Sequence, residues 1–172
     1  MIIQVSRRFA NCSINFKMKT VSVLTGAYEM KTDKIKIRLG TENNKQKLLN
    51  SHHGLDKFFF GDGRLVIAEN GNEIVGFLWA HKRKISAPVE AEEMFINYIT
   101  VFEPELRCRG IGTQMVQKII KIAKAEQVYQ IRAKVKTENV SSHRLWLKNK
   151  FSISPAQMPD GNIAVSFVGY VL

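Results

Sequence analysis

The sequence predicts an α/β fold, in which short strands alternate with helices around one core. The strongest observation is an apolar segment at 95–101, followed by a glycine-bearing loop, RCRGIG, and a long amphipathic helix. A second is the pair Asn70-Gly71 between two apolar runs, which is typical of a tight hairpin. A chain of 172 residues with 45% hydrophobic content can bury one sizeable core, so we expect a single folded domain.

The first clear element is a strand at 35–39, where isoleucine and leucine alternate with lysine and arginine. Thr41 is a suitable N-cap for a weak helix that follows, and residues 55–60 are expected to form a second helix. Residues 1–33 show no strong period, apart from a short apolar run at 20–24 that could be a strand. We interpret 1–33 as an N-terminal extension that is partly disordered, and 34–172 as the domain.

Two strands at 64–69 and 73–81 form the hairpin across Asn70-Gly71. Gly76 lies inside the second strand and indicates a close backbone approach or a bulge. Residues 81–88, with the sequence HKRKISAP, are expected to form a basic loop. This loop is interpreted as a solvated hairpin end, with a rim that attracts anions as the alternative.

The central helix at 111–125 carries an apolar stripe at spacings of three and four, which predicts one face on a sheet and one in water. A glycine loop that opens a helix after a strand is suited to an anion, since the first helical N–H groups have no acceptor and the helix dipole is positive there. Gly110 and Gly112 allow close approach. The spacing is neither that of a dinucleotide-binding loop nor that of a P-loop, which excludes those two sites.

The C-terminal part predicts a strand at 130–136, a helix that starts at 137–139 and runs to about 150, and a closing hairpin. The hairpin strands are expected at 151–156 and 163–171, joined across Pro-Asp-Gly-Asn.

The loop resembles the Arg/Gln-x-x-Gly-x-Gly/Ala signature of the GNAT family of N-acetyltransferases. The segment NVSSHRLWLKNKFSI resembles that family's Asn-x-x-Ala-x-x-Leu-Tyr-x-Lys-x-Gly-Phe segment, in agreement at Asn139, Leu145, Lys148 and Phe151. The order of elements over 34–172 matches as well. The resemblance implies a mixed, mostly antiparallel central sheet flanked by helices on both faces. It also implies transfer of an acetyl group from acetyl-CoA to a primary amine of a small molecule or protein.

The resemblance further implies which residues hold acetyl-CoA. The glycine loop and helix start would bind the pyrophosphate, and the end of the central strand would bind the pantetheine arm and the thioester carbonyl. The implied cofactor-binding residues are Ile99, Thr100, Val101, Arg107, Cys108, Arg109, Gly110, Ile111, Gly112, Thr113, Asn139 and Trp146. No metal is expected.

A base must take a proton from the ammonium form of the acceptor. Glu93 is the first candidate, since it precedes the central strand and shares strand parity with Asn97 and Ile99; a simple surface position is the alternative for it. Glu92 and His81 are further candidates.

The family's proton donor to the departing thiolate is a tyrosine, and Trp146 stands at that position. An indole does not ionise usefully, so Trp146 is interpreted as a core or pocket-wall aromatic. Tyr98 or water is the expected donor. The missing tyrosine leaves a catalytically silent acyl-CoA-binding module as the rival function.

The net charge of +11 favours an acidic partner such as acetyl-CoA. No nucleic-acid motif is present, so nucleic acid is an unlikely partner. The apolar runs are too short to span a bilayer and the N-terminus lacks an export signal, so we expect a cytoplasmic protein without membrane partners. Cys12 and Cys108 are expected to be reduced thiols. The acceptor's identity stays open, and so does the oligomeric state, with a homodimer one option.

Overall fold

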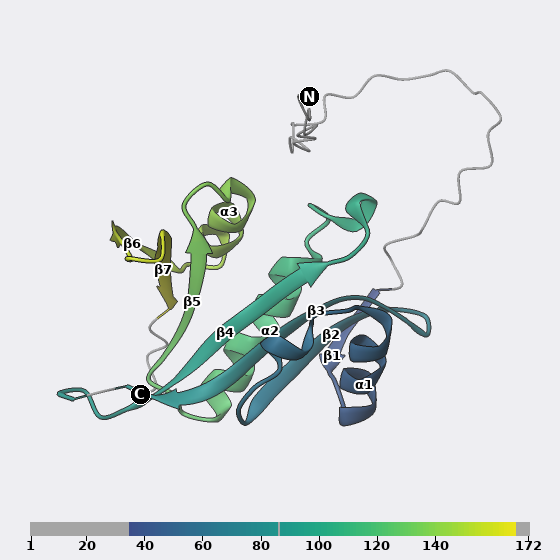
Figure 1. Cartoon of the computed structure of the whole chain (residues 1–172), viewed down its shortest axis with the longest axis horizontal. Coiled ribbons are helices and arrows are strands. Elements are labelled where there is room, and N and C mark those ends of the chain that lie inside the picture. Colours follow the sequence, from purple (N-terminus) through teal and green to yellow (C-terminus); the bar gives the residue numbers. More distant parts are fainter. Residues whose placement is uncertain (1–34, 86, 168–172) are drawn as a thin grey trace, which may run out of the picture. The chain divides into compact units, whose positions relative to one another are not determined.

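The computed structural model describes residues 35–85 and 87–167. Within this part of the chain, a seven-stranded sheet has the order β1-β2-β3-β4-β5-β7-β6 (Figure 1). Every neighbouring pair is antiparallel except β4 with β5, so the predicted mixed, mostly antiparallel sheet is confirmed. The strands are β1 (Ile35–Leu39), β2 (Gly63–Asn70), β3 (Glu73–Lys84), β4 (Glu92–Val101), β5 (Gln130–Lys136), β6 (Ser152–Gln157) and β7 (Asn162–Phe167).

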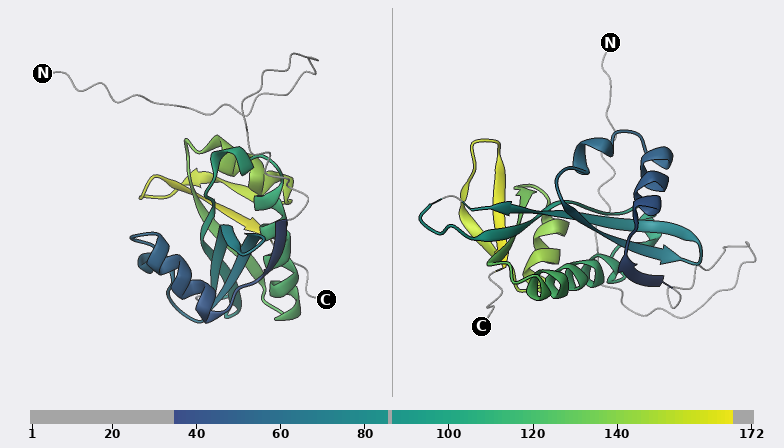
Figure 2. Two further views of the ribbon diagram at one scale, coloured as in Figure 1. Left: turned by 90° about the vertical axis from the view of Figure 1, so that its right-hand side faces the viewer. Right: turned by 90° about the horizontal axis from the view of Figure 1, so that it is seen from below.

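Helices cover both faces of this sheet, as predicted. Helix α2 (Ile111–Ala125) packs its apolar stripe on one face, and α3 (Val140–Lys148) contacts β6 and the start of α2. Helix α1 (Glu42–Ser51) and the 3₁₀ turn η2 (Asp56–Phe58) cover the other face. Figure 2 shows α1 and α2 on opposite sides of the sheet. The core under α1 and η2 consists of Leu48, Leu55, Leu65, Ile67, Phe77 and Trp79.

The start of α1 is fixed by a capping box. The Thr41 hydroxyl accepts from the Asn44 N–H at 3.4 Å, and the Asn44 side-chain oxygen accepts from the Thr41 N–H at 2.9 Å. The predicted N-cap is confirmed. The second helix expected at 55–60 is only the three-residue η2, because the next residues turn to dock Phe59 on Phe77 and Trp79.

Strand β3 ends at Lys84, three residues beyond the predicted strand end at His81, so the prediction of a loop is wrong for residues 82–84. Arg83 lies opposite Glu93 and Lys84 lies opposite Glu92 in β4. These cross-strand charge pairs stabilise the strand end in place of an apolar alternation, so no local hydrophobic pattern predicts it.

Gly76 confirms the expected close approach, since a Cβ built there would lie 2.6 Å from the carbonyl oxygen of Thr100. The strand expected at 130–136 is β5, and the closing hairpin is formed by β6 and β7. The proposed extension at 1–33, its strand at 20–24 and the hairpin end beyond residue 167 lie outside the described residues.

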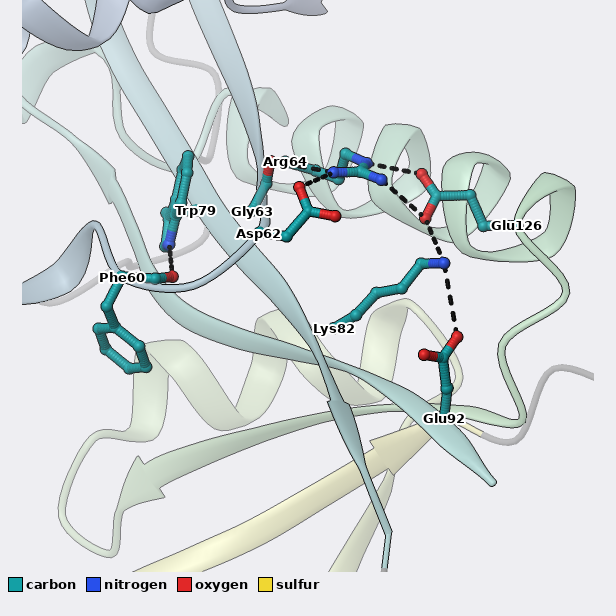
Figure 3. A network of polar contacts seen from close by, with 8 residues as sticks. All are labelled: Phe60, Asp62, Gly63, Arg64, Trp79, Lys82, Glu92 and Glu126. Carbon is teal, nitrogen blue, oxygen red and sulfur yellow. Dashed lines mark hydrogen bonds and ion pairs between the residues drawn. The ribbon is translucent and has the colours of Figure 1, made fainter. Parts of the chain in front are cut away.

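A polar network joins the C-terminal end of α2 to three strands (Figure 3). Glu126 follows α2 directly and binds Arg64 of β2 at 2.7 Å and Lys82 of β3 at 3.3 Å. Lys82 also reaches Glu92 of β4 at 3.5 Å. Hydrogen bonds to Glu126 raise the pKa of Arg64. The network therefore fixes the C-terminal end of α2 against the sheet. The apolar stripe packs the rest of the helix on the same face.

No helix in the ranges 35–85 and 87–167 is long and apolar enough to cross a membrane.

Candidate active site

The two parallel strands at the centre of the sheet part from each other. Strand β4 pairs with β5 from Glu93 opposite Gln130 only as far as Ile96 opposite Ala133. Both strands continue, β4 to Val101 and β5 to Lys136, and they diverge in Figure 1. On its other edge β4 stays paired with β3 as far as Val101 opposite Gly76. One backbone edge at 97–101 therefore faces the gap, with hydrogen-bonding groups available to an extended ligand.

Helix α2 begins beside this region and its start carries no side-chain cap. Gly110, its N-cap residue, has φ +86°, and apart from its chain neighbours no atom of the described residues lies within 4 Å of a Cβ built there. The first turn holds no acidic residue. The N–H groups of Ile111, Gly112 and Thr113 therefore lie at an open, positively polarised helix end. This arrangement agrees with the anion site expected from the glycine loop.

The two arginines of the loop do different things. The Arg107 guanidinium donates to the carbonyl oxygens of Val101 and Phe102, both at 3.0 Å, and so closes the turn between β4 and α2. This turn contains the 3₁₀ segment η3 (Pro104–Leu106). Arg109 is exposed and forms no ion pair with any residue that the structure describes, so its charge is available to an anion. Cys108 is exposed and adopts a left-handed conformation, φ +60°.

Helix α3 borders the same region. Asn139 is its N-cap, and its side-chain oxygen accepts from the Ser142 N–H at 3.0 Å. Gly112 of α2 lies against Leu145, with 3.5 Å between a built Cβ and the leucine Cδ1. Trp146 is only 2% exposed, donates its indole N–H to the Ser142 hydroxyl at 3.0 Å, and packs on Phe151. The interpretation of Trp146 as a core aromatic agrees with this position, and its contact with a coenzyme stays a prediction.

A β-bulge in β4 places the side chains of Asn97 and Tyr98 on the face under α1 and η2. Trp79 lies opposite Tyr98 and Ala80 lies opposite Ile96, so Asn97 is the extra residue. The Asn97 side chain reaches His81 at 2.8 Å, and the Tyr98 ring stacks on Phe58 at 4.1 Å between centroids. The prediction that Glu93, Asn97 and Ile99 share one face of the strand therefore fails after the bulge.

Ile99 is the residue for which this parity matters. It lies opposite Leu78, whose neighbours Phe77 and Trp79 belong to the α1-side core, so Ile99 faces the α2 side of the sheet. Glu93 and Ile99 are consequently on different faces. The sequence signal for the bulge is Asn97 itself, which interrupts the apolar run MFINYI.

Glu93 is 2% exposed, so the alternative of a simple surface position is wrong. Its carboxylate accepts from Arg83 at 2.5 Å and from Gln130 at 2.7 Å, and Arg132 lies at 3.6 Å. These contacts tie β3, β4 and β5 together just before the strands part. The carboxylate oxygens therefore already accept hydrogen bonds from Arg83 and Gln130, and Arg132 lies close by. A role of Glu93 as base stays a prediction.

The sequence from residue 35 to 151 matches the model of the acetyltransferase (GNAT) family. Among curated protein sequences, none is significantly similar to this chain.

Solved structures with the same fold include NAA60 of Arabidopsis thaliana in complex with acetyl-CoA, with a TM-score of 0.62, 18% identity, and coverage of 78% of this chain and 98% of that one. A GNAT family acetyltransferase from Elizabethkingia anophelis with acetyl-CoA bound has a TM-score of 0.60 and 21% identity, with coverage of 80% of this chain and 100% of that one. The IAA acetyltransferase of Bacillus cereus has a TM-score of 0.60 and 18% identity, with coverage of 78% of this chain and 99% of that one. At these identities the similarity concerns the fold.

Proposed function

Because the chain belongs to the GNAT family of acetyltransferases, we propose that it moves the acetyl group of acetyl-CoA to a primary amine of a small molecule or a protein. As a member of that family it is an acyltransferase; the acetyl-CoA co-substrate and the amine acceptor are the proposal. The observation that carries it is the joining of two features by one short turn. An uncapped helix start suited to phosphate stands next to parted strands suited to an extended chain.

The residues present fit acetyl-CoA at both features. The N–H groups of the first turn of α2, with Arg109 beside them, would hold the pyrophosphate. The free edge of β4 around Ile99 and Thr100 would hold the pantetheine arm by main-chain hydrogen bonds. The acetyl-CoA bound in the Arabidopsis and Elizabethkingia structures of the same fold supports this choice of ligand.

The protein's part in the chemistry is to polarise the thioester and to manage protons. A backbone N–H of β4 aimed at the carbonyl oxygen would stabilise the transition state by about 3 kcal/mol. Tyr98, which lies beside the bulge, is the side chain proposed to protonate the departing thiolate. A thiol with an ordinary pKa of about 8.5 leaves without strong acid help, so this donation is an assistance and not a requirement.

Thermal unfolding with and without acetyl-CoA tests the coenzyme site. A ligand at 100 times its dissociation constant adds about 2.7 kcal/mol to the free energy of unfolding, so a clear rise in melting temperature is expected at millimolar acetyl-CoA. A folded protein whose melting temperature does not change would refute the site.

Release of free thiol in the presence of a panel of primary amines tests the transfer. The panel should include an alkylamine, an aralkylamine, a peptide with a free α-amine and a lysine side chain. We expect amine-dependent thiol release with at least one member. Normal stabilisation by acetyl-CoA without any amine-dependent release would instead support the silent binding module.

A further inference from the structure

We infer that His81 is the base that deprotonates the acceptor amine, and that Asn97 is the positioning residue that fixes its tautomer and orientation. This inference rests on the proposed function. It moves the base from Glu93, whose carboxylate is enclosed by Arg83, Arg132 and Gln130, to a side chain with a free ring nitrogen.

The hydrogen bonds around Asn97 determine which nitrogen of His81 carries the proton. The Asn97 amide nitrogen lies 3.1 Å from the carbonyl oxygen of Phe58, which can only accept. The amide group therefore donates to Phe58, and its oxygen faces the His81 ring. Because that oxygen only accepts, His81 Nδ1 must donate to it over the 2.8 Å that separates them.

Neutral His81 consequently carries its lone pair on Nε2. This nitrogen makes no hydrogen bond to any residue in the described part of the chain. A neutral imidazole held in one tautomer by a partner on its other nitrogen is the arrangement that general bases use.

His81 also lies at the right place in the sheet. It pairs with Phe95, one residue before Ile96, where the pairing of β4 with β5 ends. Its hydrogen-bond partner Asn97 is the bulge residue that follows. An acyl group that passes between the parted strands would reach the α1 side of the sheet next to this pair.

The ring is enclosed by aromatic groups and is 8% exposed. Phe60 lies 4.7 Å away between centroids and Phe95 lies 5.9 Å away. Phe60 is itself 51% exposed, and Gly61 lies beside the imidazole, since a Cβ built there would be 3.3 Å from His81 Cδ2. A solvent-facing ring and a glycine therefore cover the histidine on that side.

The charged groups near the ring are already paired with each other. Arg83 stacks over Phe95 at 3.8 Å and is bound to Glu93. In the loop that packs on His81, Asp62 is bound to Arg64. These pairs leave Asn97 as the polar group that contacts the imidazole directly.

The step is a proton transfer followed by acyl transfer. His81 Nε2 takes one proton from the ammonium form of the acceptor, and the amine lone pair then forms the C–N bond at the thioester carbonyl. The C–S bond breaks, and the thiolate takes a proton from Tyr98, which regains one from solvent, or directly from water. The new amide nitrogen loses its second proton to solvent, and His81 returns its own proton to solvent for the next cycle.

Four variants test the inference, each with melting temperature, stabilisation by acetyl-CoA, and the pH profile of kcat/KM for the best amine of the panel. His81→Asn keeps an N–H toward Asn97 but has no basic nitrogen. Asn97→Asp places a carboxylate against Nδ1. Glu93→Gln neutralises the rival base, and His53→Gln changes an exposed histidine as the matched control.

His81→Asn is expected to lower kcat/KM by roughly 100-fold and to remove the acidic limb of the profile, with acetyl-CoA stabilisation unchanged. Asn97→Asp is expected to move the acidic limb to higher pH, because a carboxylate stabilises the imidazolium form. A merely structural role of Asn97 would not move this limb. Glu93→Gln and His53→Gln are expected to retain the limb where the parent has it.

An unchanged kcat/KM and acidic limb in His81→Asn would overturn the inference while leaving the proposed function intact. Loss of the limb in Glu93→Gln would also overturn it, in favour of Glu93. If His81→Asn does not fold, an unshifted limb in folded Asn97→Asp would count against it. A parent protein that acetylates no amine would overturn the proposed function, and this inference with it.

Discussion

Gly110 and Gly112 serve the α2 start in different ways. Gly110 adopts φ +86° in open space, so its requirement is conformational. Gly112 has an ordinary helical position, and a Cβ there would make only a normal contact with Leu145. The first glycine shapes the turn, and the second keeps a side chain away from the N–H groups of the helix end.

Gly112→Ala is therefore expected to bind acetyl-CoA about tenfold more weakly while its stability stays equal or rises by up to about 1 kcal/mol, since alanine favours the helix. Gly110→Ala should instead lose about 1 kcal/mol of stability, because an L residue is strained at its positive φ. Denaturant unfolding and isothermal titration measure the two quantities. Equal affinity of Gly112→Ala and the parent would show that the phosphate does not approach this residue.

Trp146 stands at the motif position of the family's tyrosine, and the structure buries it in the core. Its indole N–H donates a hydrogen bond to the Ser142 hydroxyl, and its ring is buried against Phe151. We expect Trp146→Phe to lower the free energy of unfolding by about 1–3 kcal/mol through lost volume and an unsatisfied hydroxyl partner.

Trp146→Tyr is the matched variant for chemistry, since it adds a hydroxyl to nearly the same ring. Because residue 146 lies in the core, the Tyr variant should be no faster than the Phe variant at saturating acetyl-CoA. A clearly faster Tyr variant would place residue 146 at the departing thiolate and contradict the burial argument.

At the scale of elements, long periodic segments were predictable and charged or bulged ones were not. The stripe of α2 and the alternation of β5 depend on neighbours a few residues apart, so the sequence shows them directly. The end of β3 depends on Glu92 and Glu93 across the sheet. The His81–Asn97 contact spans 16 residues and exists only because the bulge turns Asn97 to that face, which no local period reveals.

The turn between β6 and β7 offers a test at this scale. A hydrogen bond from Lys134 of β5, together with hydrogen bonds from Asn162, lowers the pKa of Asp160 from 3.8 to about 2. A carboxyl group with a lowered pKa adds stability above its unfolded value of about 3.9, and this contribution is lost as the pH falls toward the folded value. The turn should therefore keep its ion pair down to about pH 3.

Carboxyl NMR measures this directly. The Asp160 signal should still be mostly that of the ionised form at about pH 3, where an ordinary aspartate is mostly protonated. Lys134→Gln is expected to move the midpoint upward. A midpoint near the ordinary value in the parent would mean that the Lys134 contact is not maintained in solution.

For the molecule as a whole, charge is the property that sequence states most completely. The net charge is +11, and several of the carboxylates are used within the sheet and its turns, such as Glu69, Glu93, Glu126 and Asp160. Since each of these carboxylates is paired with a cation, the excess positive charge stays unpaired, and it should draw polyanions by long-range attraction.

The affinity for acetyl-CoA should therefore fall several-fold between about 50 and 300 mM salt, as the Debye length shortens from roughly 14 to 6 Å. An acetyl thioester of pantetheine, which lacks the phosphates, is the control and should show little salt dependence. Equal salt dependence of the two ligands would argue against a phosphate contact at the start of α2.

The parting of β4 from β5 has a consequence for the rate at which backbone amides of β4 exchange with deuterium. Amides of β4 between 97 and 101 alternate between the edge bonded to β3 and the edge that faces the gap. In the free protein the gap-facing amides should exchange fast although they lie in the middle strand of the sheet, while their neighbours in the same strand exchange slowly. With acetyl-CoA the fast set should become slow, so that deuterium uptake in this one strand reports occupancy residue by residue.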